Sequence, residues 1–534
     1  MRNLKQYTGP VLLVLFVLMM GAWHYLDVEA GAIGSGDMWL SDMYMMLLAA
    51  GILLLICLAV FLFAGRIMKK IPVEITALIS ILVLGSMYMV TLPPISAPDE
   101  VSHFASAYAL SNRILGGEAV DDEGNVWMRQ EDEFIQNIYM AEGDEARESL
   151  GRVLTEETWK QIMSRMSPIF VSQEAKEITA SVSSPVNTTP AAYLAPALGI
   201  TLGRLIGVNC MILAFMGRFF NLLFFGIMVY ESMKVLPFGK TVVWGVSLLP
   251  MSLHLAASYS YDTFLMGMCF FFGSYCIYLA YAKPVVQKRD IAILAVLAAA
   301  FGPCKMVYAV MLGFALLIPV KKFGGWKNWT ISAGTVLAAF AVSMVLVNRS
   351  TIATYASGSD NYVSWAAEEG FSIPLILHNP LLYVRIMYNS LVHLGDEWTL
   401  QLFGGSLGNL DPVLSVPFFV SLVMGACLVL LSIRNAGEAL YMKGKQKVWI
   451  CFLAAACLAG LMTAMLVGWT PISSTVIEGV QGRYLIPVIP FVLMCMKNDR
   501  VVRTAGDDRK LIYCMCALDC YVVLRLFSVV SMRL

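Results

Sequence analysis

The most reactive residue types of the chain gather in one short segment, 93–104, with the sequence PPISAPDEVSHF. Asp99 and Glu100 are adjacent carboxylates, and His103 follows Asp99 by four positions. On a helix that starts near Pro98, Asp99 and His103 would share one face. A partly dehydrated carboxylate can serve as a general base, which predicts a catalytic role for Asp99 or Glu100. The structural alternative is that both acids only interact favourably with the N-terminal dipole of a helix.

A second candidate is the segment 478–484, EGVQGRY, which directly precedes an apolar run. Its two glycines allow another backbone to approach closely, and Arg483 offers a planar guanidinium suited to phosphate. Gln481 and Tyr484 stand beside this arginine and are candidate substrate contacts. The alternative is an Arg–Tyr anchor at a membrane border, where both residue types are common.

Lys305 and Asp262 are charged residues between apolar runs. Lys305 lies in the sequence GPCKMVY. Three interpretations stay open: its side chain is at the tip of an outward hairpin, it is buried and has a functional role, or it extends its ammonium to the membrane surface. Asp262 ends the sequence SYSYD and could form an ion pair with Lys305 or contact substrate. We count Asp262, Lys305 and Tyr308, together with His103, as candidate substrate-binding residues.

Other polar residues are interpreted as structural. Arg218 and Asn221 lie inside an apolar run and are expected to hold helices together. A divalent cation could bind Asp99 and His103, but two ligands do not make a site, so no metal ligand is assigned. The twelve cysteines all lie in or at the edge of apolar runs, so neither a disulfide framework nor a zinc site is expected.

These residues stand in a chain whose composition is that of a membrane protein. Of its 534 residues, 58% are hydrophobic and 14% are charged, and the mean hydropathy is +0.71. Soluble domains carry roughly 25% charged residues, so an all-α polytopic membrane protein is predicted rather than a water-soluble enzyme. The 37 basic and 37 acidic residues cancel, which argues against a nucleic-acid binder because that function needs a basic face.

Apolar runs divide the chain into about twelve to fourteen predicted transmembrane helices, since roughly 20 apolar residues cross a bilayer. The long runs are 8–26, 43–65, 72–92, 211–232, 241–258, 263–282, 328–347, 413–433, 448–468 and 511–530. Four others are short and are expected to be tilted, broken or re-entrant: 190–206, 290–304, 305–320 and 484–496.

Basic residues cluster between these runs, and the positive-inside rule puts the clusters and the N-terminus on the cytoplasmic side. The loop 93–189 is then extracytoplasmic, and it holds 17 acidic and 7 basic residues. The turn 258–263, the loop 348–412 and the segment 469–483 share that side, where the polar and unusual residues gather. This parity requires that one of the two runs within 190–232 is not a full crossing.

The large outer loop carries apolar residues at helical spacing, namely Leu150, Val153, Leu154, Ile162, Met163 and Met166. This pattern predicts an amphipathic helix on the membrane or the bundle, or a small subdomain that shields the bundle. The cytoplasmic loops are short and basic, and no GxxxxGK[ST] phosphate loop occurs. An ATP-driven pump within this chain is therefore not expected.

Together these motifs resemble the bacterial domain-of-unknown-function family 2142, a family of predicted integral membrane proteins. The resemblance rests on APDEVSHF at 97–104 and GVQGRYLIP at 479–487, which are specific in combination. Weaker matches are PAAYLAPALG at 190–199, RFFN at 218–221, Asp262, Lys305 with Tyr308, and LGNLD at 407–411. The resemblance covers about 72 to 500 and leaves the hairpin 8–65 outside.

That family is similar in layout to the GT-C glycosyltransferases, in which an acidic residue at the start of a large outer loop acts as base. The resemblance implies a glycosyltransferase of the bacterial cytoplasmic membrane, with Asp99 or Glu100 as base and Lys305 and Arg483 as phosphate contacts. It implies a polyprenyl-phosphate sugar as donor and an inverting reaction. The acceptor would be an extracytoplasmic cell-envelope polysaccharide, a teichoic-acid-like polymer or a lipid-linked glycan.

We therefore expect an N-terminal transmembrane hairpin at 1–70, a GT-C-like core at 71–500 and a C-terminal transmembrane helix at 501–534. Two other functions stay open. A transporter or flippase of lipid-linked saccharides would show charges in mid-membrane and broken helices, although no internal repeat is seen. A non-catalytic scaffold of envelope assembly would tolerate the loss of Asp99 and Glu100.

Overall fold

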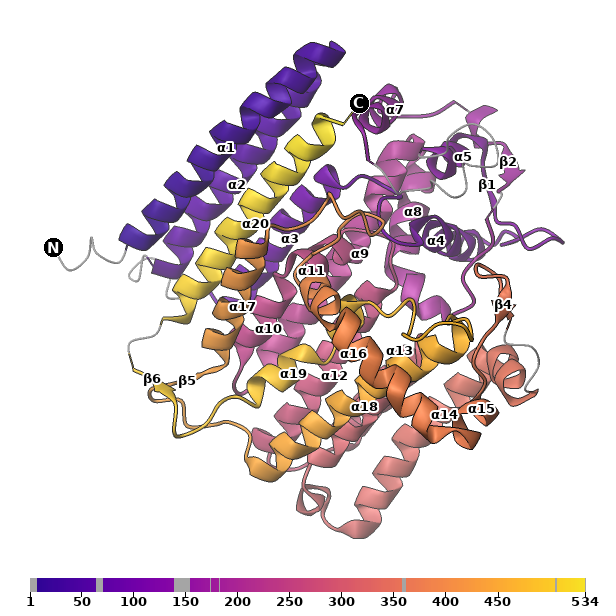
Figure 1. Cartoon of the computed structure of the whole chain (residues 1–534), viewed down its shortest axis with the longest axis vertical. Helices are drawn as coiled ribbons and strands as arrows, with labels where there is room; N and C mark the ends of the chain where they lie inside the picture. The colour runs from indigo at the N-terminus through magenta and orange to yellow at the C-terminus, as the bar shows by residue number, and fades with distance from the viewer. Residues whose placement is uncertain are drawn as a thin grey trace.

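The computed structural model describes residues 7–63, 71–138, 154–172, 174–181, 183–357, 362–504 and 507–533. Nearly all regular structure within these ranges is helical (Figure 1), which confirms the predicted all-α polytopic fold. The strands of these ranges form three two-stranded sheets. They are β1 (Trp127–Arg129) with β2 (Ile178–Ala180), β3 (Tyr362–Val363) with β4 (Glu368–Glu369), and β5 (Arg434–Asn435) with β6 (Val502–Arg503).

Eight helices of the described residues are long and apolar enough to cross a membrane. They are α1 (Thr8–Ser35), α2 (Trp39–Phe63), α3 (Val73–Thr91), α9 (Cys210–Val235), α12 (Asp262–Tyr281), α14 (Trp326–Ser357, apolar to Arg349), α18 (Gly444–Gly468) and α20 (Asp508–Ser531). Each coincides with one of the predicted long runs, and where a run extends past its helix it does so by no more than two residues. Lipid offers no partner to backbone N–H and C=O groups, so such a run must satisfy them within its own helix.

The other predicted runs form shorter or broken helices. The run 241–258 becomes α10 (Lys240–Ser247) and α11 (Pro250–Ala256), because Pro250 lacks the N–H that would continue the first helix. The run 305–320 is a 3-10 helix, η3 (Met306–Leu317), followed by η4 (Val320–Phe323). The remaining runs are α13 (Lys288–Phe301), α17 (Phe418–Ser432), and η5 (Gly482–Leu485) with α19 (Ile489–Met494).

The run 190–206 does not cross the bundle. It forms η2 (Pro190–Tyr193) and α8 (Leu194–Ile206), which pack on α4 (Glu100–Ile114) of the large loop. After α8 the chain bonds back to that loop, since the Val171 N–H donates to the Gly207 carbonyl at 3.0 Å and the Asn209 N–H to the Ile169 carbonyl at 2.9 Å. Both ends of α8 therefore lie on the side of the loop, as the charge parity requires.

The large loop gathers at one end of the molecule, at the upper right of Figure 1. Besides α4 and the β1–β2 sheet it contains α5 (Gln130–Asn137), α7 (Glu156–Ser164) and η1 (Glu174–Lys176). The amphipathic prediction is confirmed at α7, whose Ile162 is buried, as is Leu154 before it. Leu150 and Val153, which belong to the same predicted pattern, lie outside the described residues.

The segment 348–412, which is predicted to face outward, contains two further helices, α15 (Ile373–His378) and α16 (Pro380–Leu402). Arg385, Asp396 and Glu397 interrupt the apolar surface of α16, and it does not qualify as a span despite its length. Its C-terminal part packs against η5. The segment that carries Arg483 is thus held in place by contact with the helix α16.

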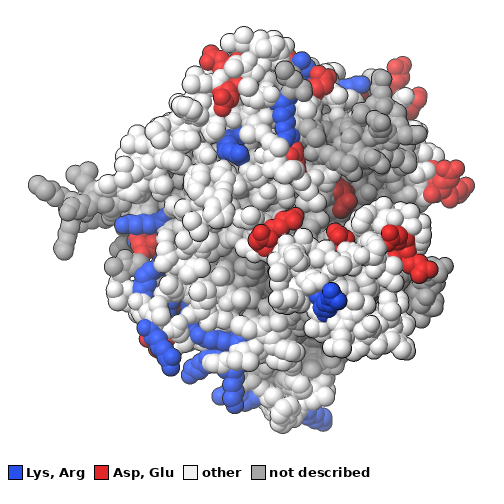
Figure 2. Space-filling view, in the orientation of Figure 1, with Lys and Arg blue, Asp and Glu red and all other residues white. Residues whose placement is uncertain are grey.

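Charge is segregated on the molecular surface. Figure 2 shows most visible Lys and Arg side chains at the lower left, over β5 and β6, and most Asp and Glu side chains toward the top and right. This separation is the one expected from basic cytoplasmic turns and an acidic outer loop.

Candidate functional site

Glu100, at the start of α4, is a buried carboxylate that links two segments of the chain. One carboxylate oxygen accepts the Ala97 N–H and the other accepts the Tyr259 N–H, both at 2.9 Å. Arg218 of α9 stands 3.4 Å away, and both side chains are shielded from solvent. Glu100 therefore joins the segment before α4 to the turn before α12, and its oxygens are already occupied. We do not assign it as the base.

Arg218 and Asn221 of α9 bind further backbone carbonyls of the same two segments, which is the structural role predicted for them. The Arg218 guanidinium donates to the carbonyls of Met89 at 3.2 Å and Leu92 at 2.6 Å, at the end of α3. The Asn221 amide donates to the carbonyls of Ser258 at 2.7 Å and Ser260 at 3.2 Å. These bonds fix the two chain segments from which Asp99 and Asp262 project.

Asp99 is the acid of the pair that is exposed. It precedes α4 with a φ of 57°, in the left-handed region, and makes no side-chain cap bond to the helix. The prediction that Asp99 and His103 share a helix face is therefore wrong, because Asp99 is not helical. The dipole interpretation fits Glu100, which is an acid of the first turn of α4, whereas Asp99 makes no capping bond and its side chain lines a cavity.

This cavity, of about 930 Å³, lies where five separate segments meet. It is lined by Pro98 and Asp99, by 409–413, by Met465 and Trp469 at the end of α18, by the 479–484 segment, and by Arg533 after α20. Its wall mixes polar and apolar side chains. A space of this size matches those that hold small-molecule ligands. Of the predicted site residues, Asp99, Gln481 and Tyr484 contact it.

Behind Tyr484 lies a cluster of three charged groups. The Asp262 carboxylate is 3.4 Å from the Lys305 ammonium and 3.3 Å from the Arg483 guanidinium. The ion pair with Lys305 that the sequence left open is thus present. The ammonium also lies 3.7 Å from the centre of the Tyr484 ring, a cation–π geometry. Burial alone would lower the pKa of Lys305, but Asp262 and two tyrosines raise it above its ordinary value.

Two cations share the Asp262 carboxylate in this cluster, and the Asp99 carboxylate of the cavity wall also interacts electrostatically with Arg483. Arg483 is nearly buried, and its Nη1 atom makes no hydrogen bond to any described residue. A buried, unsatisfied guanidinium nitrogen is costly, and an anionic ligand would satisfy it. The cluster is therefore suited to bind an anion such as phosphate.

His103 and Tyr308 have structural partners. His103 is buried, its Nδ1 atom is 2.7 Å from the Tyr193 hydroxyl, and the Tyr261 ring meets it edge-on at 4.9 Å. Burial lowers the pKa of His103 to about 3, so the imidazole is neutral. The Tyr308 hydroxyl donates to the Tyr484 carbonyl at 2.7 Å. Neither residue lines the cavity, but Tyr308 holds the backbone of Tyr484, which does.

The glycines around Gln481 are required by the geometry, as predicted. A Cβ on Gly482 would stand 1.8 Å from the Trp398 carbonyl of α16, and Gly479 has a φ of +77°. The Gly482 N–H donates to the Gln401 side chain at 2.9 Å. Close contact with α16 thus positions Gln481 and Tyr484 in the cavity wall, with Arg483 behind them.

Sequence reasoning did not single out several cavity residues. Arg533 forms a bidentate ion pair with Asp411, at 2.6 Å and 3.2 Å. Asp411 belongs to the LGNLD motif and so carried a weak signal. Arg533 and Trp469 carried none, because only the path of the chain brings the ends of α18 and α20 to Asp99. No group of three His, Cys, Asp or Glu residues suited to a metal ion occurs among the described residues.

Comparison with known proteins identifies the family. The chain matches no curated protein and no solved structure. A family described as "Predicted membrane protein (DUF2142)" matches residues 82–492, which is more than half of the chain. This match includes the Asp99 segment, the ion cluster and the 479–484 segment. The chain belongs to this family of predicted membrane proteins.

Proposed function

We propose that the chain is a membrane glycosyltransferase of the GT-C type, with a polyprenyl-phosphate sugar as donor. The observation that carries this proposal is the exposed carboxylate of Asp99 in the wall of a cavity of about 930 Å³, with a cationic cluster behind another wall residue, Tyr484. An acid and an anion site at one cavity are what sugar transfer from a phosphate carrier needs.

The reaction is a single displacement. The acceptor hydroxyl oxygen attacks the anomeric carbon of the donor sugar, and its proton passes to a carboxylate oxygen of Asp99. The bond between the anomeric carbon and the phosphate oxygen breaks, and the electron pair leaves with the lipid phosphate. Lys305 and Arg483 stabilise the negative charge on that phosphate. Attack opposite the leaving group inverts the anomeric configuration.

The inferred orientation supports an extracytoplasmic acceptor in a bacterial plasma membrane. The cavity is lined by Asp99, at the start of the large loop, and by Arg533, near the C-terminus that Figure 1 shows beside α7 of that loop. An envelope polysaccharide, a teichoic-acid-like polymer or a lipid-linked glycan would reach Asp99 from this side. A lipid-phosphate donor needs no nucleotide-binding domain, because it diffuses within the bilayer.

A transporter of lipid-linked saccharides is the second candidate, favoured by the break between α10 and α11 and by the 3-10 helix η3 that directly follows Lys305. Discontinuous helices commonly line transport sites. The two functions differ in what they require of Asp99. A transporter or a non-catalytic scaffold does not need a general base, whereas a transferase does.

The test replaces Asp99 by Asn and compares surface glycans of expressing and non-expressing cells by mass spectrometry. General-base removal typically slows a reaction by roughly 10²–10⁴-fold, so the sugar added by the wild type should fall below detection. Asp122→Asn is the matched control, since Asp122 is an exposed acid of the same loop outside the cavity. Both variants must insert at the wild-type level. A complete glycan with Asp99→Asn would reject the transferase.

A further inference from the structure

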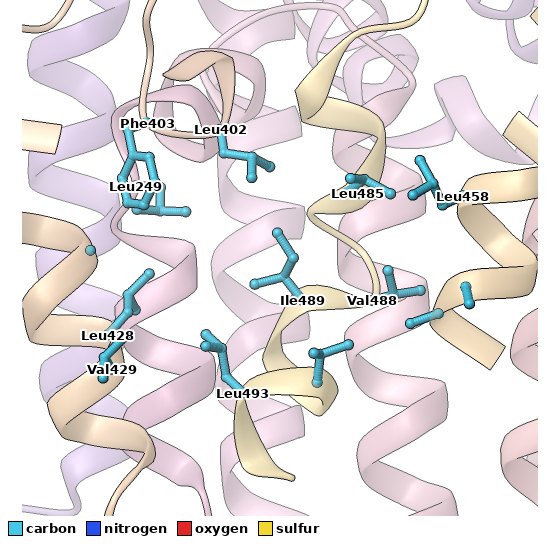
Figure 3. Close-up of a pocket in the computed structure, with 14 residues that line it drawn as sticks. Leu249, Leu402, Phe403, Leu428, Val429, Leu458, Leu485, Val488, Ile489 and Leu493 are labelled. Atoms are coloured by element: carbon cyan, nitrogen blue, oxygen red, sulfur yellow. The ribbon is translucent and has the colours of Figure 1, made fainter. Parts of the chain in front are cut away.

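A second cavity, of about 500 Å³, is lined by apolar residues (Figure 3). Its walls come from α17, α18 and α19, and its upper rim from Leu402, Phe403 and Leu485. Figure 3 shows Ile489, Val488 and Leu493 of the central segment facing the space between the flanking helices. Such a lining offers no polar partner, so the cavity suits an apolar chain.

The helices that flank this cavity present apolar side chains to the exterior. Leu422 of α17 is 63% exposed and Phe452 of α18 is 58% exposed. In a membrane protein such surfaces contact lipid chains rather than water. A chain from the bilayer can therefore reach the cavity between α17 and α18 without passing a polar barrier.

The apolar cavity adjoins the polar one through shared segments. Leu485 lines the apolar cavity, and the preceding residue, Tyr484, lines the polar cavity beneath the Lys305 ammonium. On α18, Leu458 lines the first and Met465 the second. Seven helical residues span about 10 Å, so the two spaces are close enough for one molecule to occupy both.

We propose that the apolar cavity between α17, α18 and α19 binds the isoprenoid chain of a lipid phosphate whose phosphate lies at Lys305 and Arg483. This inference rests on the proposed function and names the binding site of its donor. The Lys305 ammonium and the unsatisfied Nη1 atom of Arg483 match an anionic head group. Gly425, Ala454 and Ala455 line the cavity with small side chains, which leaves room for the methyl branches of an isoprenoid chain.

The test fills the cavity with a side chain. A Cβ at Gly425 would meet only the Phe403 ring, at 3.4 Å, so Gly425→Leu extends into the cavity without a backbone clash. Ala455→Leu fills it from the facing helix and guards against a folding defect in one variant. Gly334→Leu is the matched control, because a Cβ on Gly334 of α14 would have no neighbour within 4 Å among the described residues.

The measurement is photo-crosslinking of a prenyl phosphate with a diazirine in its chain, in phosphatidylcholine nanodiscs, mapped by mass spectrometry. We expect labelling of α17–α19 peptides in the wild type and in Gly334→Leu, and a loss of more than about tenfold in both cavity-filling variants. Unlabelled prenyl phosphate should compete. Equal labelling of all three variants would overturn the proposal.

Two competitors identify the source of the chain. An excess of phosphatidylglycerol or of the neutral prenol should compete poorly, because the first has straight chains and the second lacks the phosphate. Equal competition by either would show a site for bulk lipid or for any apolar chain and overturn the proposal. Asp99→Asn should keep wild-type labelling, so a failure of the transferase test and a failure of lipid binding are distinguishable.

Discussion

At the scale of single residues, neighbours in the sequence have opposite roles. Asp99 and Glu100 are equivalent as sequence letters, but Glu100 is enclosed by two backbone N–H groups and Arg218, whereas Asp99 is exposed to the cavity. The left-handed backbone of Asp99 separates them, since it turns this side chain out of the helix that Glu100 begins. Burial decides which of two adjacent carboxylates can meet a substrate.

His103 gives a pH dependence at the same scale. Its pKa is lowered from 6.5 to about 3 by burial, so between these values the unfolded chain binds a proton that the folded protein excludes. The stabilisation is complete above pH 6.5 and is lost as the pH falls toward 3, by up to about 1.4 kcal/mol per unit. Thermal unfolding in detergent should therefore show a midpoint that falls below pH 6.5.

Two variants separate this titration from a loss of packing. In His103→Asn the fall below pH 6.5 should be shallower than in the wild type, whatever the midpoint at pH 7. In Tyr193→Phe the imidazole remains but its hydroxyl partner is removed, so the midpoint drops and the slope stays. Parallel curves for His103→Asn and the wild type would contradict the assignment.

At the scale of elements, the sequence predicts the features that depend on local pattern. It does not predict contacts between segments that are far apart in the chain. The long apolar runs become helices because hydropathy and length suffice, and Pro250 breaks the run 241–258 by its own chemistry. The bidentate Arg533–Asp411 pair could not be foreseen, because 122 positions separate its members. Likewise, no periodicity indicates that α16 would press against Gly482.

That contact between α16 and η5 supports a prediction. Gly482→Ala puts a methyl group 1.8 Å from the Trp398 carbonyl, a backbone atom that cannot rotate away. Overpacking of this kind costs about 1–3 kcal/mol or more, and the shift would displace Gln481, Arg483 and Tyr484. We expect a lower unfolding midpoint together with reduced transfer activity.

Gly395→Ala, on the facing helix α16, is the control for Gly482→Ala. A Cβ on Gly395 would have no atom within 4 Å among the described residues, so alanine there should be neutral or stabilise α16 by about 0.5–1 kcal/mol. If both substitutions change the midpoint and the activity alike, the close approach of α16 does not position the site.

At the scale of the whole molecule, the ends of the chain complete the structure around the family match. The match covers 82–492, so α1, α2 and α20 lie outside it. They nevertheless pack together, and α20 also contacts α3 and α17. Through Arg533 the end of α20 reaches the cavity of Asp99. The site therefore depends on a segment that the family match does not include.

Orientation in the membrane is the property on which the proposed chemistry depends most. Asp122 lies in the acidic loop that begins at Asp99, and Lys445 lies in the basic first turn of α18. Both side chains are exposed. The positive-inside rule predicts that Asp122→Cys reacts with a membrane-impermeant maleimide in intact cells, and that Lys445→Cys reacts only after permeabilisation. The wild-type chain, whose cysteines lie in or beside apolar helices, sets the background. The reverse pattern would place Asp99 in the cytoplasm, where soluble nucleotide sugars are available, and would remove the reason for a lipid-phosphate donor.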